Sequence, residues 1–209
     1  DARRIADRTE RKIEARVRVL DQYLEKARET DAYGLMDLND IPDDMVIYKY
    51  VNDSLQSWCN QFSIINDDIS ARLVFQRLTD QKSTIVSPLS EVSEDLSYMN
   101  LGPKWYIVKS VDIQNGVRII AGIEILNTLI EGQHRTENGV NPVLNLPRRY
   151  SIVPLSISNG SEVSIQGKPL FKIVYDADYS SPTFDNSLLK WISLLFLAVA
   201  SVLFLAAHR

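Results

Sequence analysis

The chain has 209 residues, of which 45% are hydrophobic and 24% are charged, and its formal net charge is −4. This length suits one domain with an appendage, and the balanced charge gives no case for a nucleic-acid partner or for global disorder. The single cysteine excludes an internal disulfide framework, and together with only two histidines it excludes a zinc site of the Cys/His type.

Residues 1–30 form a charged segment that contains neither glycine nor proline, and they hold 9 of the 23 Lys and Arg residues. Most of them are good helix formers, so the segment predicts a long helix. Its apolar stripe fits two interpretations, a helix packed on its own domain and the seam of a coiled-coil homodimer, and both stay open. The 4-3-4-3 spacing of this stripe runs through Ile13, Val17, Leu20, Leu24 and Ala27.

Three pairs of β-branched and aromatic runs predict an antiparallel sheet in the middle of the chain. Asn115-Gly116 between the second pair is a strong hairpin signal, because both residues tolerate positive φ. Asp53-Ser54 and Gln166-Gly167-Lys168 are the turns expected in the other two pairs. The paired runs are 45–52 with 55–58, 104–113 with 117–126, and 161–165 with 169–175.

Two longer excursions separate these hairpins. Residues 62–102 are polar and predict a short helix over 68–78, whereas residues 127–155 have the pattern of a second helix-and-loop segment. The predicted fold class is therefore α+β, with a long N-terminal helix packed on a five- to six-stranded antiparallel sheet.

The C-terminal segment is strongly apolar. Residues 191–207 comprise 17 residues without a charge, and Leu188, Leu189 and Lys190 extend the segment to 20 residues. A bilayer core requires about 20 apolar residues, so the segment predicts a membrane span; a buried helix of a soluble domain is the alternative. The chain starts with Asp1 rather than Met and ends two residues after this segment, and we expect it to be an excerpt from a longer protein.

Sequence motifs for catalysis are absent. The chain contains no phosphate-binding glycine loop and no G-x-S-x-G elbow, and His134 lies in a charged loop without an evident serine or cysteine partner. The adjacent carboxylates Asp43-Asp44 fit a turn better than a metal site. We therefore expect no catalytic residue, no metal and no cofactor, and the chain is not predicted to be an enzyme.

A binding site lined by aromatic and basic side chains of the sheet is the remaining chemical hypothesis. The alternative for each aromatic residue is a place in the core of the sheet, and for each basic residue a solvated surface position. Arg148-Arg149 could bind an anion or face a membrane. The candidate ligand-binding residues are Trp58, Trp105, Tyr106, Lys109, Arg118 and Tyr150.

The run 45–58, MVIYKYVNDSLQSW, resembles the opening of the extracytoplasmic sensor domains of Bacteroidetes membrane histidine kinases. The strand with Trp105-Tyr106, the following strand with Gly122 and the run 167–171 (GKPLF) before the apolar segment add to this resemblance. The resemblance implies a PAS-like or Cache-like fold in the periplasm, held between two helices of the inner membrane. It implies no particular ligand, because no amino-acid-binding signature of the Cache type is found.

The expected organisation follows from the residue patterns and the resemblance together. Residues 1–34 are a signalling and dimerisation helix, residues 35–183 a periplasmic sensor domain, and residues 188–207 a transmembrane helix. A small-molecule, protein or envelope signal would pass through that span to a cytoplasmic histidine kinase outside this chain, in a homodimer. The alternatives are the sensor module of a chemoreceptor or cyclase and a tail-anchored binding protein.

Overall fold

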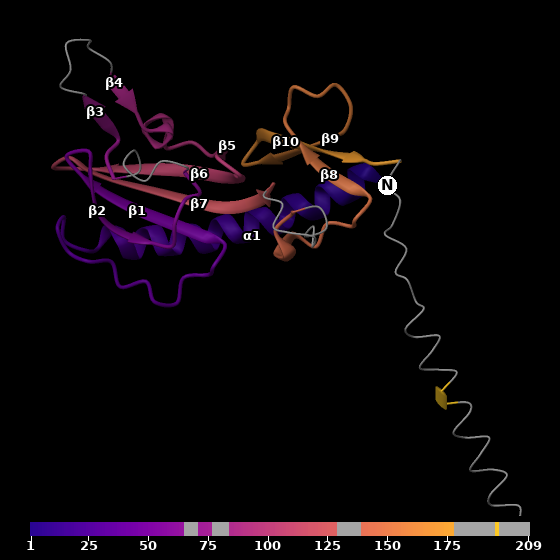
Figure 1. The fold of residues 1–209 in the computed structure, drawn as a ribbon, viewed down its shortest axis with the longest axis horizontal. Helices are drawn as coiled ribbons and strands as arrows, with labels where there is room; N and C mark the ends of the chain where they lie inside the picture. Colours follow the sequence, from indigo (N-terminus) through magenta and orange to yellow (C-terminus); the bar gives the residue numbers. More distant parts are fainter. Residues whose placement is uncertain (65–70, 77–83, 129–138, 178–194, 197–209) are drawn as a thin grey trace, which may run out of the picture. The chain divides into compact units, whose positions relative to one another are not determined.

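The computed structural model describes residues 1–64, 71–76, 84–128, 139–177 and 195–196. The chain divides into two compact units, Asp1–Asp176 and Ala177–Arg209, and nearly all described residues belong to the first. The first unit combines a long helix with antiparallel strands, which confirms the α+β class (Figure 1). In chain order its elements are α1 (Ala2–Arg28), β1 (Met45–Val51), β2 (Ser54–Cys59), β3 (Val74–Gln76), β4 (Thr84–Val86), the 3₁₀ turn η1 (Pro88–Glu91), β5 (Ser97–Leu101), β6 (Lys104–Ile113), β7 (Val117–Asn127), the 3₁₀ turn η2 (Pro142–Leu144), β8 (Tyr150–Val153), β9 (Ser161–Ile165) and β10 (Lys168–Tyr175).

The large sheet has the strand order β2-β1-β7-β6-β5, and each neighbouring pair is antiparallel. Two of the predicted hairpins, β1 with β2 and β6 with β7, supply four of its five strands. Asn115 and Gly116 have φ of 69° and 73°, as expected for an Asn-Gly hairpin turn. The first turn lies one residue earlier than predicted, because Asn52 and Asp53 are the residues with positive φ.

The third predicted hairpin, β9 with β10, belongs to a separate small sheet of the order β8-β10-β9. The predicted antiparallel sheet is thus present with five strands, whereas the expectation that the third hairpin joins it is wrong, because that hairpin lies in a three-stranded sheet. Strands β3 and β4 form a further sheet of two strands. Alternating apolar residues identify a hairpin, but they do not identify the sheet that it joins, since the pattern is the same in both.

The two excursions contain strands where none was predicted. Strand β3, which pairs with β4, lies inside the segment 68–78 for which a short helix was predicted, and part of that segment is outside the described residues. Strand β5 lies in the first excursion and β8 in the second. Both are short edge strands, of five and four residues, and so short a run shows little alternation of apolar and polar residues.

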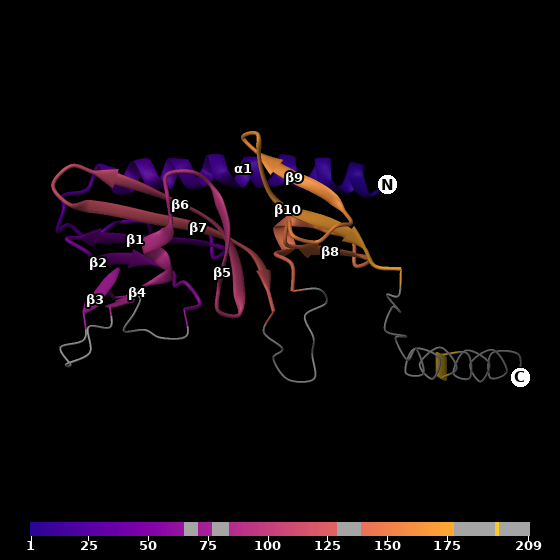
Figure 2. The ribbon, with the colours of Figure 1, turned by 90° about the horizontal axis from the view of Figure 1, so that it is seen from above.

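Helix α1 confirms the helix predicted for the first segment, and it lies along both sheets (Figure 2). All five residues of the predicted stripe are buried, with at most 2% of each residue exposed, and they share a core with residues of both sheets. Of the two interpretations, the structure therefore supports packing on the helix's own domain. A homodimer stays a prediction, and it would need a surface other than this stripe.

The segment 188–207, predicted to span a membrane, lies outside the described residues except for Leu195 and Phe196. Within the parts of the chain that the structure describes, no helix is long and apolar enough to cross a membrane.

Candidate functional site

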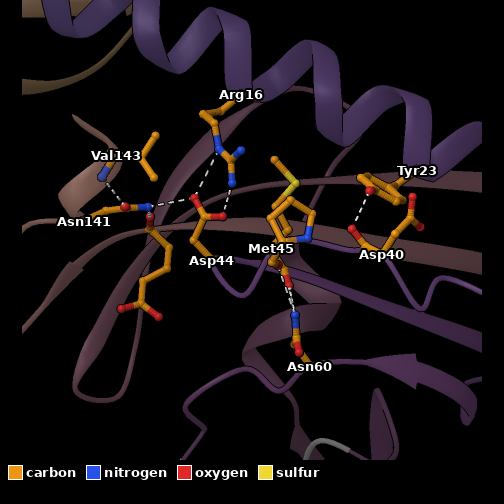
Figure 3. Close-up of polar contacts among 10 residues, drawn as sticks. Arg16, Tyr23, Asp40, Asp44, Met45, Asn60, Asn141 and Val143 are labelled. Carbon is orange, nitrogen blue, oxygen red and sulfur yellow. Dashed lines mark hydrogen bonds and ion pairs between the residues drawn. The ribbon is translucent and has the colours of Figure 1, made fainter. Parts of the chain in front are cut away.

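A group of three polar side chains joins α1 to the large sheet and to η2, and we call it the polar junction: Arg16, Asp44 and Asn141 (Figure 3). Arg16 lies in the middle of α1, and Asp44 directly precedes β1. Arg16 donates two hydrogen bonds to Asp44, from Nη2 to Oδ1 and from Nε to Oδ2, the second at 3.2 Å. This two-point contact fixes the direction of the guanidinium group, and it occurs where both side chains are less than one-fifth exposed.

Asn141 connects this ion pair to the end of β7 and to η2. Its Nδ2 donates to Asp44 Oδ2 at 2.8 Å and to the carbonyl oxygen of Glu124 at 2.7 Å. Its Oδ1 accepts a hydrogen bond from the backbone N–H of Val143 at 2.9 Å, which caps η2. The side chain of Asn141 is thus satisfied on both sides, and a displacement of β1, β7 or η2 would disturb the same three residues.

Further polar contacts attach the N-terminal half of α1 to η2 and to strand β9 of the small sheet. Lys12 Nζ donates to the carbonyl oxygens of Leu144, at 2.7 Å, and Val143, at 3.3 Å. Glu10 Oε2 accepts a hydrogen bond from the backbone N–H of Ser164 in β9 at 3.2 Å. The first half of the helix is therefore held by η2 and β9.

The C-terminal half of α1 is attached to the large sheet. Asp21 pairs with Lys109 of β6 at 2.8 Å. Lys49 of β1, only 1% exposed, donates from Nζ to the carbonyl oxygens of Thr30 and Asp31 and to Thr30 Oγ1, which places its ammonium group just beyond the helix C-terminus. Burial lowers the pKa of Lys49, and the charge of Asp31 opposes this shift.

Three of the six predicted ligand-binding residues lie on the outer face of the large sheet, the face opposite α1. Tyr106 is fully buried there, and its hydroxyl group lies 3.2 Å from Ser63 Oγ. Arg118 donates to the carbonyl oxygen of Val92 and lies 3.2 Å from Asp112 Oδ1. Trp58 is 53% exposed on the edge strand β2.

The other three candidates lie elsewhere. Lys109 is on the face toward α1, in the ion pair described above. Trp105 stacks on Tyr98, with 4.9 Å between ring centroids, and Tyr150 of the small sheet packs edge-on against Tyr175. The six residues thus do not line one common surface, and ligand binding by any of them stays a prediction.

The residues of the polar junction were not among the predicted site residues. Arg16 and Asp44 are 28 residues apart, and Asp44 and Asn141 are 97 apart, so no local spacing brings them together. Asp44 was noted only as part of a turn. The only feature of the sequence that could have drawn attention to Asp44 is its position directly before an apolar strand, and many ordinary turn residues share that position.

Metal and thiol chemistry receive no support from the geometry. Across the described ranges, no group of three or more His, Cys, Asp and Glu side chains could hold a metal ion. Cys59 is half-buried, and burial raises the pKa of its thiol group, which disfavours the reactive thiolate.

Comparison of the chain with protein families, with curated proteins and with solved structures finds no match in any of the three.

Proposed function

We propose that this chain is the signal-sensing region of a membrane sensor histidine kinase, which detects a periplasmic signal and relays it through its C-terminal apolar segment. The resemblance of residues 45–58 to such sensor domains supports the proposal, as does the combination of a long helix with an antiparallel sheet. The kinase itself would lie outside this chain.

The observation that carries the proposal is that one continuous helix is fastened to two separate sheets. Its first half is held by η2 and β9, its second half by β6 and β1, and the polar junction lies between the two regions. A signal that altered the large sheet would act on Asp44 at the start of β1, and through it on Arg16 and Asn141.

Relay of this kind needs two arrangements of the helix and sheets that differ by little free energy. A signal shifts such an equilibrium only as far as its affinities for the two arrangements differ, and a few kcal/mol suffice to change the major state. The small sheet ends with β10, from which the chain continues toward the apolar segment. Helix α1 contacts Asp44 through Arg16 and β9 through Glu10, so it connects the large sheet to the sheet from which the chain leaves.

Autophosphorylation of the parent protein in membrane vesicles tests this function. We expect Asp44→Asn to change the histidine phosphorylation rate several-fold at unchanged ATP, because it weakens the contact with Arg16 and alters the balance between the two arrangements. Asp43→Asn is the matched control, since Asp43 is exposed and adjacent. If neither variant changed the phosphorylation rate, this result would count against relay through the polar junction.

The coding sequence on both sides of these residues separates the alternatives. A region with a phospho-acceptor histidine after residue 209 supports the kinase, whereas a methyl-accepting or cyclase region would identify a different receptor with the same sensor. A protein with no such region, and with residues 1–176 on the cytoplasmic side, would instead be a tail-anchored binding protein.

A further inference from the structure

Charge is distributed unevenly along α1. Residues 2–12 contain five basic and two acidic residues, whereas residues 29–44, which follow the helix, contain six acidic residues and no basic one. The folded unit therefore has a basic end, at the start of α1, and an acidic loop, which leaves the C-terminal end of α1 and returns to Arg16 in the middle of the helix. An anionic surface would attract the basic end and repel the acidic loop.

The basic residues at the start of α1 point away from the core. Arg3, Arg4 and Arg8 are all exposed, and among the described residues none of the three forms an ion pair. The charge of Arg8 also adds to the lowering of the pKa of Lys12, after the larger effect of burial, which shows that positive charges crowd here.

A second basic segment reaches the same end from a distant part of the chain. Arg148 and Arg149, which precede β8, are exposed. Arg149 donates from Nη1 to the hydroxyl group of Tyr175 at 3.3 Å, and its carbonyl oxygen accepts the backbone N–H of Asp176 at 2.8 Å. Both arginines therefore lie where the chain leaves the folded unit.

The start of α1 and the exit of the chain after β10 lie at one end of the unit in both views (Figures 1 and 2). Only 12 residues separate Tyr175 from Leu188, the start of the apolar segment. Fully extended, this connection spans at most about 45 Å. If the apolar segment is in a bilayer, as the proposed function requires, the basic end is tethered near the membrane surface.

We propose that this basic end, formed by Arg3, Arg4, Arg8, Arg148 and Arg149, docks on anionic phospholipid headgroups and orients the sensor unit on its membrane. The inference rests on the membrane anchorage in the proposed function, and it adds the chemistry of the surface that the unit contacts. A second copy of the chain is a less suitable partner for the basic end, because a two-fold axis through this end would place like charges against each other.

The full chain, reconstituted in vesicles, tests the docking. In a Cys59→Ser background, a fluorophore is attached to Ala2→Cys at the basic end or to Ala32→Cys in the acidic loop; both positions are partly exposed. The vesicles contain a headgroup-labelled quencher lipid, with or without phosphatidylglycerol. We expect quenching at position 2 that requires the anionic lipid and weakens in high salt, and little quenching at position 32.

A charge variant and its matched control sharpen this test. Each arginine close to an anionic surface contributes about fivefold to binding, so Arg3→Gln/Arg4→Gln/Arg8→Gln should lower the docking equilibrium about a hundredfold. Arg18→Gln/Lys26→Gln/Arg28→Gln removes the same charge from exposed positions further along α1 and should leave the quenching at position 2 nearly unchanged.

Two results would overturn the inference in distinguishable ways. A chain that resists alkaline extraction, but whose position-2 quenching does not depend on anionic lipid or on the three arginines, contradicts docking and leaves the anchorage intact. A chain that alkali extracts, and that does not float with anionic vesicles, contradicts both the docking and the membrane anchorage of the proposed function.

Discussion

A single glycine determines how the outer face of the large sheet is packed. A Cβ atom at Gly122 of β7 would lie 2.6 Å from Phe62 Cε1 and 3.2 Å from a methyl group of Val108. The ring of Phe62 is held edge-on by Tyr48 and Tyr106, at centroid distances of 5.0 and 5.2 Å, so it has little room to move. The strand with Gly122 is one of the segments that carry the resemblance, and the close contact with Phe62 explains why a residue without a side chain is needed at this position.

We expect Gly122→Ala to lower the free energy of unfolding by about 1–3 kcal/mol, the usual effect of overpacking a core. Urea denaturation followed by circular dichroism measures this change. The double variant Gly122→Ala/Phe62→Leu should lose less than the sum of the two single variants, because the smaller side chain makes room for the added methyl group. Additive losses would show that Phe62 and Gly122 are not in strained contact.

Lys49 gives a pH dependence with a defined sign. Burial lowers the pKa of Lys49 in the folded chain, whereas in the unfolded chain the pKa has its ordinary value of about 10.4. At a pH between these two pKa values, the unfolded state binds more protons than the folded state. Stability conferred by Lys49 therefore rises as the pH increases through this window. Urea unfolding at several alkaline pH values should show wild type gaining stability relative to Lys49→Met; a constant difference would contradict the lowered pKa.

At the scale of elements, the ion pair between Arg16 and Asp44 is the contact by which helix and large sheet should be coupled. We expect a double-mutant cycle with Arg16→Met and Asp44→Asn to give a coupling energy of about 1–3 kcal/mol, since the pair is hydrogen-bonded and mostly buried. A parallel cycle with Arg18→Met and Asp43→Asn, both at exposed positions, should give almost none. Equal coupling in the two cycles would refute a special role for the junction.

The elements also show how far the sequence could predict this structure. Helix α1 and all three predicted hairpins follow from local periodicity and turn residues, because such patterns depend on neighbours in the chain. Strand β5 forms a local hairpin with β6 across Gly102 and Pro103, and this hairpin was not predicted. The edge strand β8, which pairs with β10, and the division into two sheets depend on partners farther along the chain. The same holds for the polar junction, whose members Arg16, Asp44 and Asn141 come from three distant segments.

For the whole molecule, continuity of α1 is the property on which relay depends. Ala27→Pro would remove a hydrogen bond inside the last turn and displace the helix end, at a cost of about 3 kcal/mol or more. We expect this variant to uncouple the signal from kinase output in membrane vesicles, with near-native circular dichroism as the check on folding.

Ala2→Pro is the control for that experiment, because the first helical residue has no intrahelical partner for its N–H group and accepts proline. It should keep both helix content and signalling. Signalling that survives in Ala27→Pro would argue that the path from sensor to output does not run along the helix.

The pairing of β1 with β7 has a consequence for biogenesis. Met45 pairs with Ile123 and Val51 with Val117, so the buried central strand β1 leaves the ribosome well before its partner is made. At about 5–20 residues per second, this delay is about 4–16 s. During that time α1 is already available to cover one face of the hairpin of β1 and β2, but the hairpin has an unpaired edge and an uncovered outer apolar face, which favours aggregation. The nascent chain should therefore depend on a holding chaperone, or on export before folding, until β7 closes the sheet.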